Sequence, residues 1–138
     1  MRLLARLARE QRGNVLALAA IMLTVTIVIA GSSVDTARLY LVKVRLQQAC
    51  DSGVLAGRRF MVDDGNANLD SNASTQATNF FNNNFKTGWL GTSSVAFTPS
   101  KTSSNRVAGT ASAVVPMTLT KIIGMPSQTI NVTCEARY

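Results

Sequence analysis

The chain has 138 residues, with 14 Lys and Arg against seven Asp and Glu, and it contains no His. This length accommodates one domain at most, and the absence of His removes the commonest general base and metal ligand. Nine of the basic residues but only three of the acidic ones lie in residues 1–59. The positive charge therefore flanks an apolar segment and does not indicate a nucleic-acid surface.

The sequence lacks the short motifs of common catalytic and nucleotide-binding sites. It contains no G-x-S-x-G, P-loop, G-x-G-x-x-G or H-E-x-x-H pattern. Glu10 and Glu135 are its only Glu residues, and they do not form a pair suited to acid–base chemistry. We therefore predict a protein that is not an enzyme, with no cofactor, no metal site, no small-molecule substrate and no nucleic-acid partner.

Residues 1–13 form a basic segment, MRLLARLAREQRG, in which four Arg accompany a single Glu. A short basic stretch before an apolar span is typical of the cytoplasmic side of a membrane. We expect this segment to remain in the cytoplasm, with the rest of the chain entering or crossing the membrane.

Residues 15–34 form an apolar run without a single charge. At about 1.5 Å per residue, twenty helical residues span roughly 30 Å, which matches one hydrocarbon core. Because the run continues without Pro into residues 35–57, we predict one long helix over residues 14–60, half in lipid and half in water. A cleaved secretory signal is the alternative, since Ala30 precedes Gly31 in a small-x-small pattern typical of signal-peptidase sites.

The water-side half of this helix is amphipathic. Apolar and small residues recur at intervals of three and four from Leu39 to Phe60, so one stripe should face a partner. Gly53 and Gly57 form a G-x-x-x-G, which permits close approach by a sheet or a neighbouring subunit; alternatively they only mark the end of the helix. The predicted helix-packing interface consists of Leu39, Val42, Leu46, Ala49, Gly53 and Gly57. If this stripe packs on sister helices, Leu46→Asp should abolish assembly while the protein still accumulates.

Residues 61–138 are expected to form a small exported α+β head. Weak helical spacing predicts a short helix over residues 67–83, with Phe80 or Phe81 on the first helix; disorder is the alternative. Residues 93–98 and 105–115 are predicted strands, and a short helix should follow Pro116. The final segment alternates most clearly, which predicts a half-buried antiparallel strand and a sheet of about three strands. Its inward residues are Ile130, Val132, Cys134, Ala136 and Tyr138.

The two cysteines fall on predicted inward faces, Cys50 on the small-residue side of the long helix and Cys134 on the final strand. In an exported, oxidising compartment an even cysteine count favours a disulfide between them, which would fasten the sheet to the helix. Two free buried thiols are the alternative. Two Cys without His cannot complete a tetrahedral zinc site within one chain.

Several segments resemble the TadE/TadG-like pilus-assembly family. They are R-G-N-V-x-x-L-A from Arg12, V-D-x-A-R from Val34, L-Q-Q-A-C-D-S-G-V-L-A-G from Leu46 and V-P-M-T-L-T-K-I-I-G from Val115. The resemblance implies a pilin-like subunit of a bacterial inner membrane, with one membrane pass and a periplasmic C-terminal head. The implied partners are membrane lipid and other Tad (tight adherence) pilus components or pilin-like subunits, copies of this chain included.

The resemblance also bears on size and processing. Larger TadG-like members carry a further von Willebrand A-like domain, so this sequence resembles a short form. Processed pilins of such systems carry a Gly followed by Glu at the fifth mature position, whereas the fifth residue after Gly13 is Leu18. We predict a minor pilin-like or assembly subunit. The alternative is a small secreted or membrane-anchored binding or adhesin module unrelated to pili, which cell fractionation would distinguish.

Overall fold

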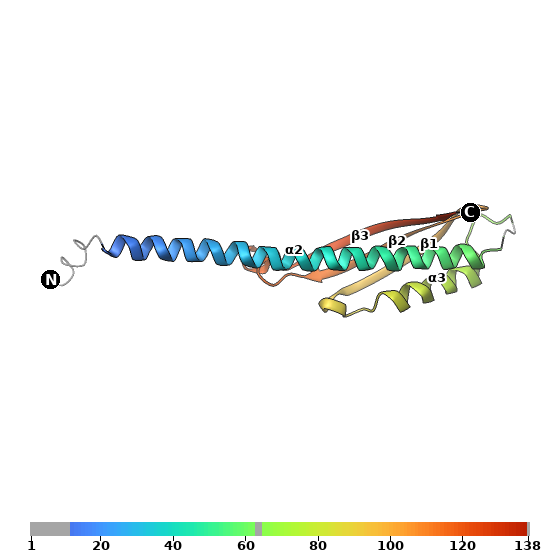
Figure 1. Cartoon of the computed structure of the whole chain (residues 1–138). Helices are drawn as coiled ribbons and strands as arrows, with labels where there is room; N and C mark the ends of the chain where they lie inside the picture. Colours follow the sequence, from blue (N-terminus) through green and yellow to red (C-terminus); the bar gives the residue numbers. More distant parts are fainter. Residues whose placement is uncertain (1–11, 63–64, 138) are drawn as a thin grey trace.

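The computed structural model describes residues 12–62 and 65–137. Its dominant element is α2, a helix over Arg12–Phe60 with 49 residues, which at 1.5 Å per residue is about 73 Å long. Figure 1 shows α2 as a rod whose N-terminal part projects beyond the rest of the molecule. The predicted long N-terminal helix is confirmed. Residues 1–11, which hold most of the predicted cytoplasmic segment, lie outside the described residues.

A second helix, α3 over Ser71–Asn84, lies along the C-terminal half of α2. It starts later than predicted because Asp70 caps it, accepting a hydrogen bond from the Ala73 N–H at 2.9 Å. This donor, followed by the Val62 N–H, holds the pKa of Asp70 below its ordinary value. Phe81 is the aromatic residue that packs into the core, whereas Phe80 is 45 % exposed.

Three antiparallel strands complete the head in the order β1-β2-β3: β1 over Ser93–Ser103, β2 over Arg106–Pro116 and β3 over Ser127–Arg137. β1 is longer than the predicted residues 93–98, because its pairing with β2 continues through Pro99 opposite Gly109, which an edge strand tolerates. Along β3 the predicted alternation holds for Ile130, Val132, Cys134 and Ala136, which are buried. Tyr138, the last residue predicted to face inward, lies outside the described residues.

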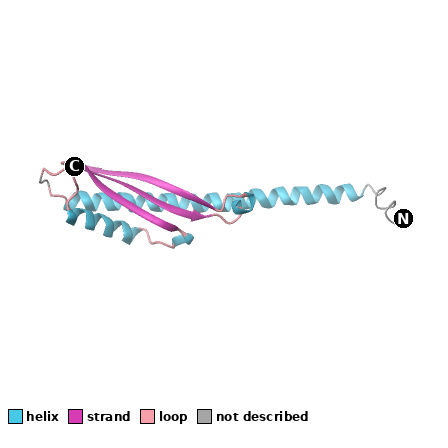
Figure 2. Cartoon of the chain, turned by 180° about the vertical axis from the view of Figure 1, so that it is seen from behind, coloured by secondary structure: helices cyan, strands magenta, loops and turns pink. Residues whose placement is uncertain are grey.

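The head has two layers, with one face of the sheet on the two helices (Figures 1 and 2). α2 packs mainly on β2 and β3, and α3 contacts β1. Phe81 of α3 stacks on Phe97 of β1 with ring centroids 4.5 Å apart. Short 3₁₀ turns, η1 over Trp89–Gly91 and η2 over Thr120–Ile123, form the connections before β1 and before β3. This arrangement confirms the predicted α+β fold.

Candidate assembly interface

Asp35 joins the apolar half of α2 to the head. Its carboxylate accepts hydrogen bonds from the backbone N–H groups of Thr118 at 3.0 Å, Leu119 at 2.9 Å and Thr120 at 2.9 Å. The Thr120 hydroxyl adds a fourth at 3.1 Å. These donors, the Thr120 N–H foremost, stabilise the ionised form and hold the pKa of Asp35 well below its usual range. The start of η2 is thus clamped to α2 directly after the charge-free run.

Arg38, one turn further along α2, makes a second contact with the same segment. Its Nη1 donates to the Pro116 carbonyl at 3.0 Å and to the Thr118 hydroxyl at 3.3 Å. Asp35 and Arg38 belong to the V-D-x-A-R motif, and Pro116 and Thr118 belong to the V-P-M-T-L-T-K-I-I-G segment. Two motifs that are 80 residues apart in the chain are therefore in direct contact.

Gly31 lets this loop lie directly on α2. A Cβ at Gly31 would overlap the side chain of Leu119, so a larger residue there would push the loop away. Gly31 lies four residues before Asp35, which places Leu119 against the last turn of the charge-free run.

A disulfide joins the final strand of the head to the same helix, further along α2 than Asp35. It joins Cys50 of α2 to Cys134 of β3, whose Cα atoms are 5.8 Å apart. Cys50 is fully buried and Cys134 is 8 % exposed. The structure therefore contains the cysteine pairing that the sequence favoured, between the helix and the final strand.

The predicted helix-packing interface is covered from within the chain. Val42, Leu46 and Ala49 are fully buried, and Leu39 is a partly buried residue packed against the same core. The chain's own head covers this stripe, so the fully buried side chains present no surface to a sister helix. Leu46→Asp would place a charge in the core and prevent folding, so that variant cannot report on assembly alone.

The two glycines of the G-x-x-x-G serve this internal packing. A Cβ at Gly53 would lie 2.7 Å from the ring of Phe97, and one at Gly57 would lie 3.2 Å from the Cβ of Ala77. The first contact is with the sheet and the second is with α3. The close approach that the sequence allowed to a sheet or a neighbour is made inside the subunit.

The opposite face of α2 is uncovered. Tyr40 is 68 % exposed, Leu41 53 % and Val44 38 %. Figure 2, from behind, shows the sheet in front of α2, so the helix covers the sheet with one face only. We call the uncovered apolar stripe at intervals of three and four residues the open face. It crosses the junction with the head and consists of Ala30, Val34, Ala37, Leu41 and Val44.

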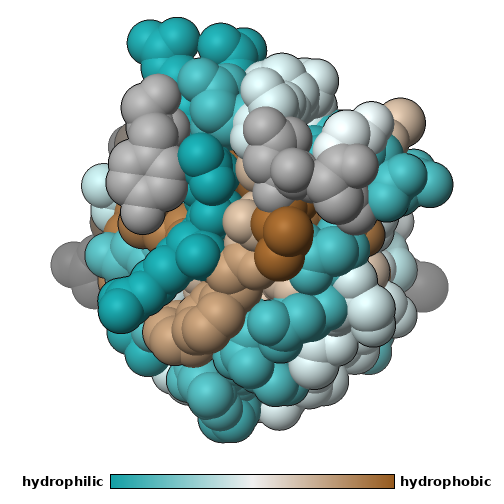
Figure 3. Space-filling model, turned by 90° about the vertical axis from the view of Figure 1, so that its right-hand side faces the viewer, coloured by the Kyte–Doolittle hydropathy of each residue, from teal (hydrophilic) through white to brown (hydrophobic). Residues whose placement is uncertain are grey.

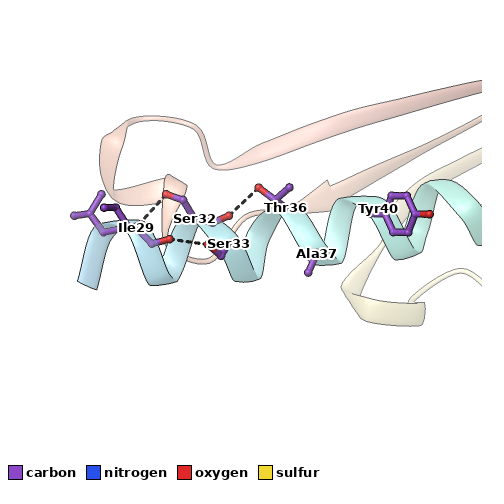
Figure 4. Close-up of a pocket in the computed structure, with 7 residues that line it drawn as sticks. Ile29, Ser32, Ser33, Thr36, Ala37 and Tyr40 are labelled. Carbon is purple, nitrogen blue, oxygen red and sulfur yellow. Dashed lines mark hydrogen bonds between the residues drawn. The ribbon is translucent and has the colours of Figure 1, made fainter. Parts of the chain in front are cut away.

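Hydroxyl groups near the junction are satisfied within α2 itself. Ser32, Ser33 and Thr36 each donate to the carbonyl four residues earlier, at 2.8–2.9 Å (Figure 4). Thr24 and Thr26 do the same within the apolar run. Ser32, Ser33 and Thr36 line an open hollow on the α2 surface; its other lining residues are Val28, Ile29, Ala37 and Tyr40. Because the donors are already used, this surface can meet lipid or another helix without an unpaired hydroxyl.

The end of the head farthest from the projecting part of α2 has a more hydrophilic surface than the open face. Figure 3 views the molecule from this end and shows a surface that is mostly hydrophilic, with some hydrophobic groups near its centre and at its left side. Arg106 of β2 and Glu135 of β3 form an ion pair at 2.9 Å. This end offers no apolar strip comparable to the open face of α2 on the surface that is shown.

The remaining predicted site residues lie within α2. Gly13 and Ala30, the two candidate processing positions, both fall inside the helix, and neither interrupts it. Over residues 12–62 and 65–137, no group of three or more His, Cys, Asp or Glu is placed to hold a metal ion.

A comparison with protein-family models finds a match to the first part of the chain. Residues 13–68 match the model of the family described as Flp pilus-assembly TadE/G-like. This part of the chain is similar to that family. The TadE/G-like segment contains the apolar run, Asp35, Cys50 and the open face, and it ends before α3. The similarity of this segment to a pilus-assembly family supports a pilus-related role. No curated protein and no solved structure matches the chain.

Sequence reasoning did not select Asp35 and Arg38 as site residues of the TadE/G-like segment. One signal was available, because Asp35 is the only acid between Glu10 and Asp51 and directly follows the apolar run. An acid that is held at the edge of a membrane needs a partner. The partner itself, more than 80 residues away in the chain, could come only from the tertiary structure.

Proposed function

We propose that this chain is a non-catalytic, minor pilin-like or assembly subunit of a Tad pilus in a bacterial inner membrane. Residues 15–34 of α2 span the bilayer once, the basic segment before them lies in the cytoplasm, and the head lies in the periplasm. The observation that carries this proposal is the continuity of α2. A membrane-length apolar half, left uncovered by the chain, runs unbroken into a head that is fastened to it at Asp35 and Cys50.

The open face of α2 is the surface we propose for contact with a neighbouring subunit, in place of the stripe that the head covers. Subunits anchored in one membrane with the same topology present their helices in parallel. Ala30, Val34, Ala37, Leu41 and Val44 follow the spacing of a helix–helix seam. Small residues favour close packing in the lipid part, and burial of apolar surface favours association in the water part.

The composition of α2 limits how far this seam extends. The next positions at the same spacing are the polar Gln48 and the acidic Asp51. At Asp51 a parallel second copy of the chain would place like charges together. The apolar contact therefore ends about three turns beyond the membrane. The proposed occupant is the parallel helix of a second anchored pilin-like subunit. The disulfide fits the periplasm, where such bonds form and persist.

The test is Leu41→Asp, with Thr129→Asp as the matched control. Both side chains are exposed, the first on the open face and the second on β3, so both variants should fold, form the disulfide and accumulate. We expect Leu41→Asp cells to lose pili and Thr129→Asp cells to keep them. Normal pili with Leu41→Asp would refute the surface, and normal pili after deletion of the gene would refute the pilus role.

A second measurement separates the subunit from the secreted-module alternative. The proposal predicts that the protein fractionates with the membrane and that its intact mass includes residues 15–34. A soluble protein whose mass begins at Gly31 would instead support release after Ala30.

A further inference from the structure

We propose that the loop around η2, residues 119–125, enters the lipid headgroup region beside α2, so that the subunit contacts the membrane at a second point. This inference rests on the membrane anchoring proposed above. The first support is position. Leu119 lies on Gly31, which belongs to the charge-free run, and Asp35 holds the N–H groups at the start of η2. The loop is therefore fixed at the level where the run ends. Figure 1 shows it beside α2 at the end of the head nearest the projecting part of the rod.

The second support is the pattern of exposure. Ile122 is 80 % exposed and Met125 is 52 % exposed. Among the described side chains from β1 to the end of β3, these are the two large apolar ones that stand out into solvent. They occupy the end of the head that meets the apolar half of α2, whereas the exposed residues that follow at the start of β3 are the polar Ser127, Gln128 and Thr129. Lys121, on the same turn, can place its ammonium group among lipid phosphates while its stem lies along the apolar boundary.

The third support is the hydrogen bonding of the loop backbone, because unpaired N–H groups oppose entry into lipid. The N–H groups of residues 118, 119 and 120 bind Asp35 at 2.9–3.0 Å. Within the loop, the Ile122 N–H donates to Leu119, the Gly124 N–H to Lys121 and the Met125 N–H to Thr120, at 3.0–3.1 Å. The loop thus presents apolar side chains on a backbone whose donors are largely used internally.

Contact between this loop and lipid would fix the rotation of the subunit about the axis of α2. A single membrane helix can rotate freely about its own axis. When a loop on one side of the helix also enters the lipid, that rotation is restricted, and each face of the helix keeps one direction relative to the membrane surface. The loop adjoins the side of α2 that carries Gly31 and Asp35, and the open face points elsewhere. Lipid contact by the loop would therefore hold the open face sideways, toward neighbouring subunits.

Depth-dependent fluorescence quenching tests the inference on the full chain in vesicles of phosphatidylcholine and phosphatidylglycerol. Trp89, the only Trp, is replaced by Phe, and single Trp residues are placed at Ile122, at Leu23 in the apolar run and at Val62 in the far part of the head. All three native side chains are at least 60 % exposed, so the substitutions should be tolerated. With Ile122→Trp we expect emission at shorter wavelength than with Val62→Trp, and a loss of intensity with lipids brominated near the headgroup.

The controls separate this inference from the anchoring on which it rests. If Leu23→Trp is quenched and Ile122→Trp behaves like Val62→Trp, the loop does not enter lipid and the inference is refuted. If Leu23→Trp escapes quenching as well, the proposed anchoring itself fails. If Ile122→Trp is shielded from a water-soluble quencher and also from brominated lipid, another protein surface covers the loop, and the lipid assignment is overturned.

Discussion

Loss of the Cys50–Cys134 disulfide should remove a large part of the stability of the head. The bond joins residues 84 apart in the chain, and for a loop of that length the chain-entropy relation gives about 4.6 kcal/mol. Folded domains have about 5–15 kcal/mol in total. This head lies toward the low end of that range, because many of its buried residues, such as Ala49, Ala73 and Ala113, are small and contribute little apolar surface.

Urea unfolding of the oxidised and the reduced full chain in detergent measures this contribution. Trp89 packs edge-on against Phe85 with ring centroids 6.1 Å apart, so its emission should follow unfolding of the head. For an m-value of about 1–2 kcal/mol/M in urea, the midpoint should fall by roughly 2–5 M on reduction. The double variant Cys50→Ala, Cys134→Ala should unfold like the reduced protein and should not respond to reductant.

A small effect would refute the reasoning. If oxidised and reduced protein differ by less than about 1 kcal/mol, loop closure is not a dominant contribution to stability. A double variant that still responds to reductant would show that the measured shift comes from a source other than this bond.

Three further outcomes are expected. Leu46→Ala should destabilise the head by about 3 kcal/mol, because Leu46 is fully buried. Leu41→Ala on the open face should change the free energy of unfolding by less than about 0.5 kcal/mol. Urea unfolding of the two variants compares them directly. Asp35→Asn should accelerate hydrogen exchange at the backbone N–H groups of residues 118–120, because the Asn side-chain carbonyl is a weaker acceptor than the carboxylate. Equal exchange rates in Asp35→Asn and in the exposed control Asp51→Asn would contradict the clamp. The folded-state pKa of Asp70 lies below its ordinary value of 3.8. Its stabilising contribution is therefore present above that pH and is lost as the pH falls through the lower folded value. Asp70→Asn should reduce the dependence of the unfolding midpoint on acid pH, and an unchanged dependence would argue against the cap.

The long helix and the final strand followed from the sequence because their signals are local. A charge-free run of membrane length that continues without Pro allows one conformation throughout. The period of two along β3 assigns Cys134 to the inward face, and the helical period assigns Cys50 to the small-residue stripe. With an even cysteine count, these two assignments were sufficient to favour the pairing that the structure contains.

Tertiary structure alone decided which surface of α2 remains available. Periodicity locates a stripe that must be buried, but it does not identify the occupant, because a sheet of the same chain and a helix of another chain satisfy the same pattern. Here the head occupies the stripe around Leu46 and leaves the face around Leu41 uncovered. The contact of Asp35 with residues 118–120 likewise depends on chain reversals between α2 and η2, which no local spacing encodes.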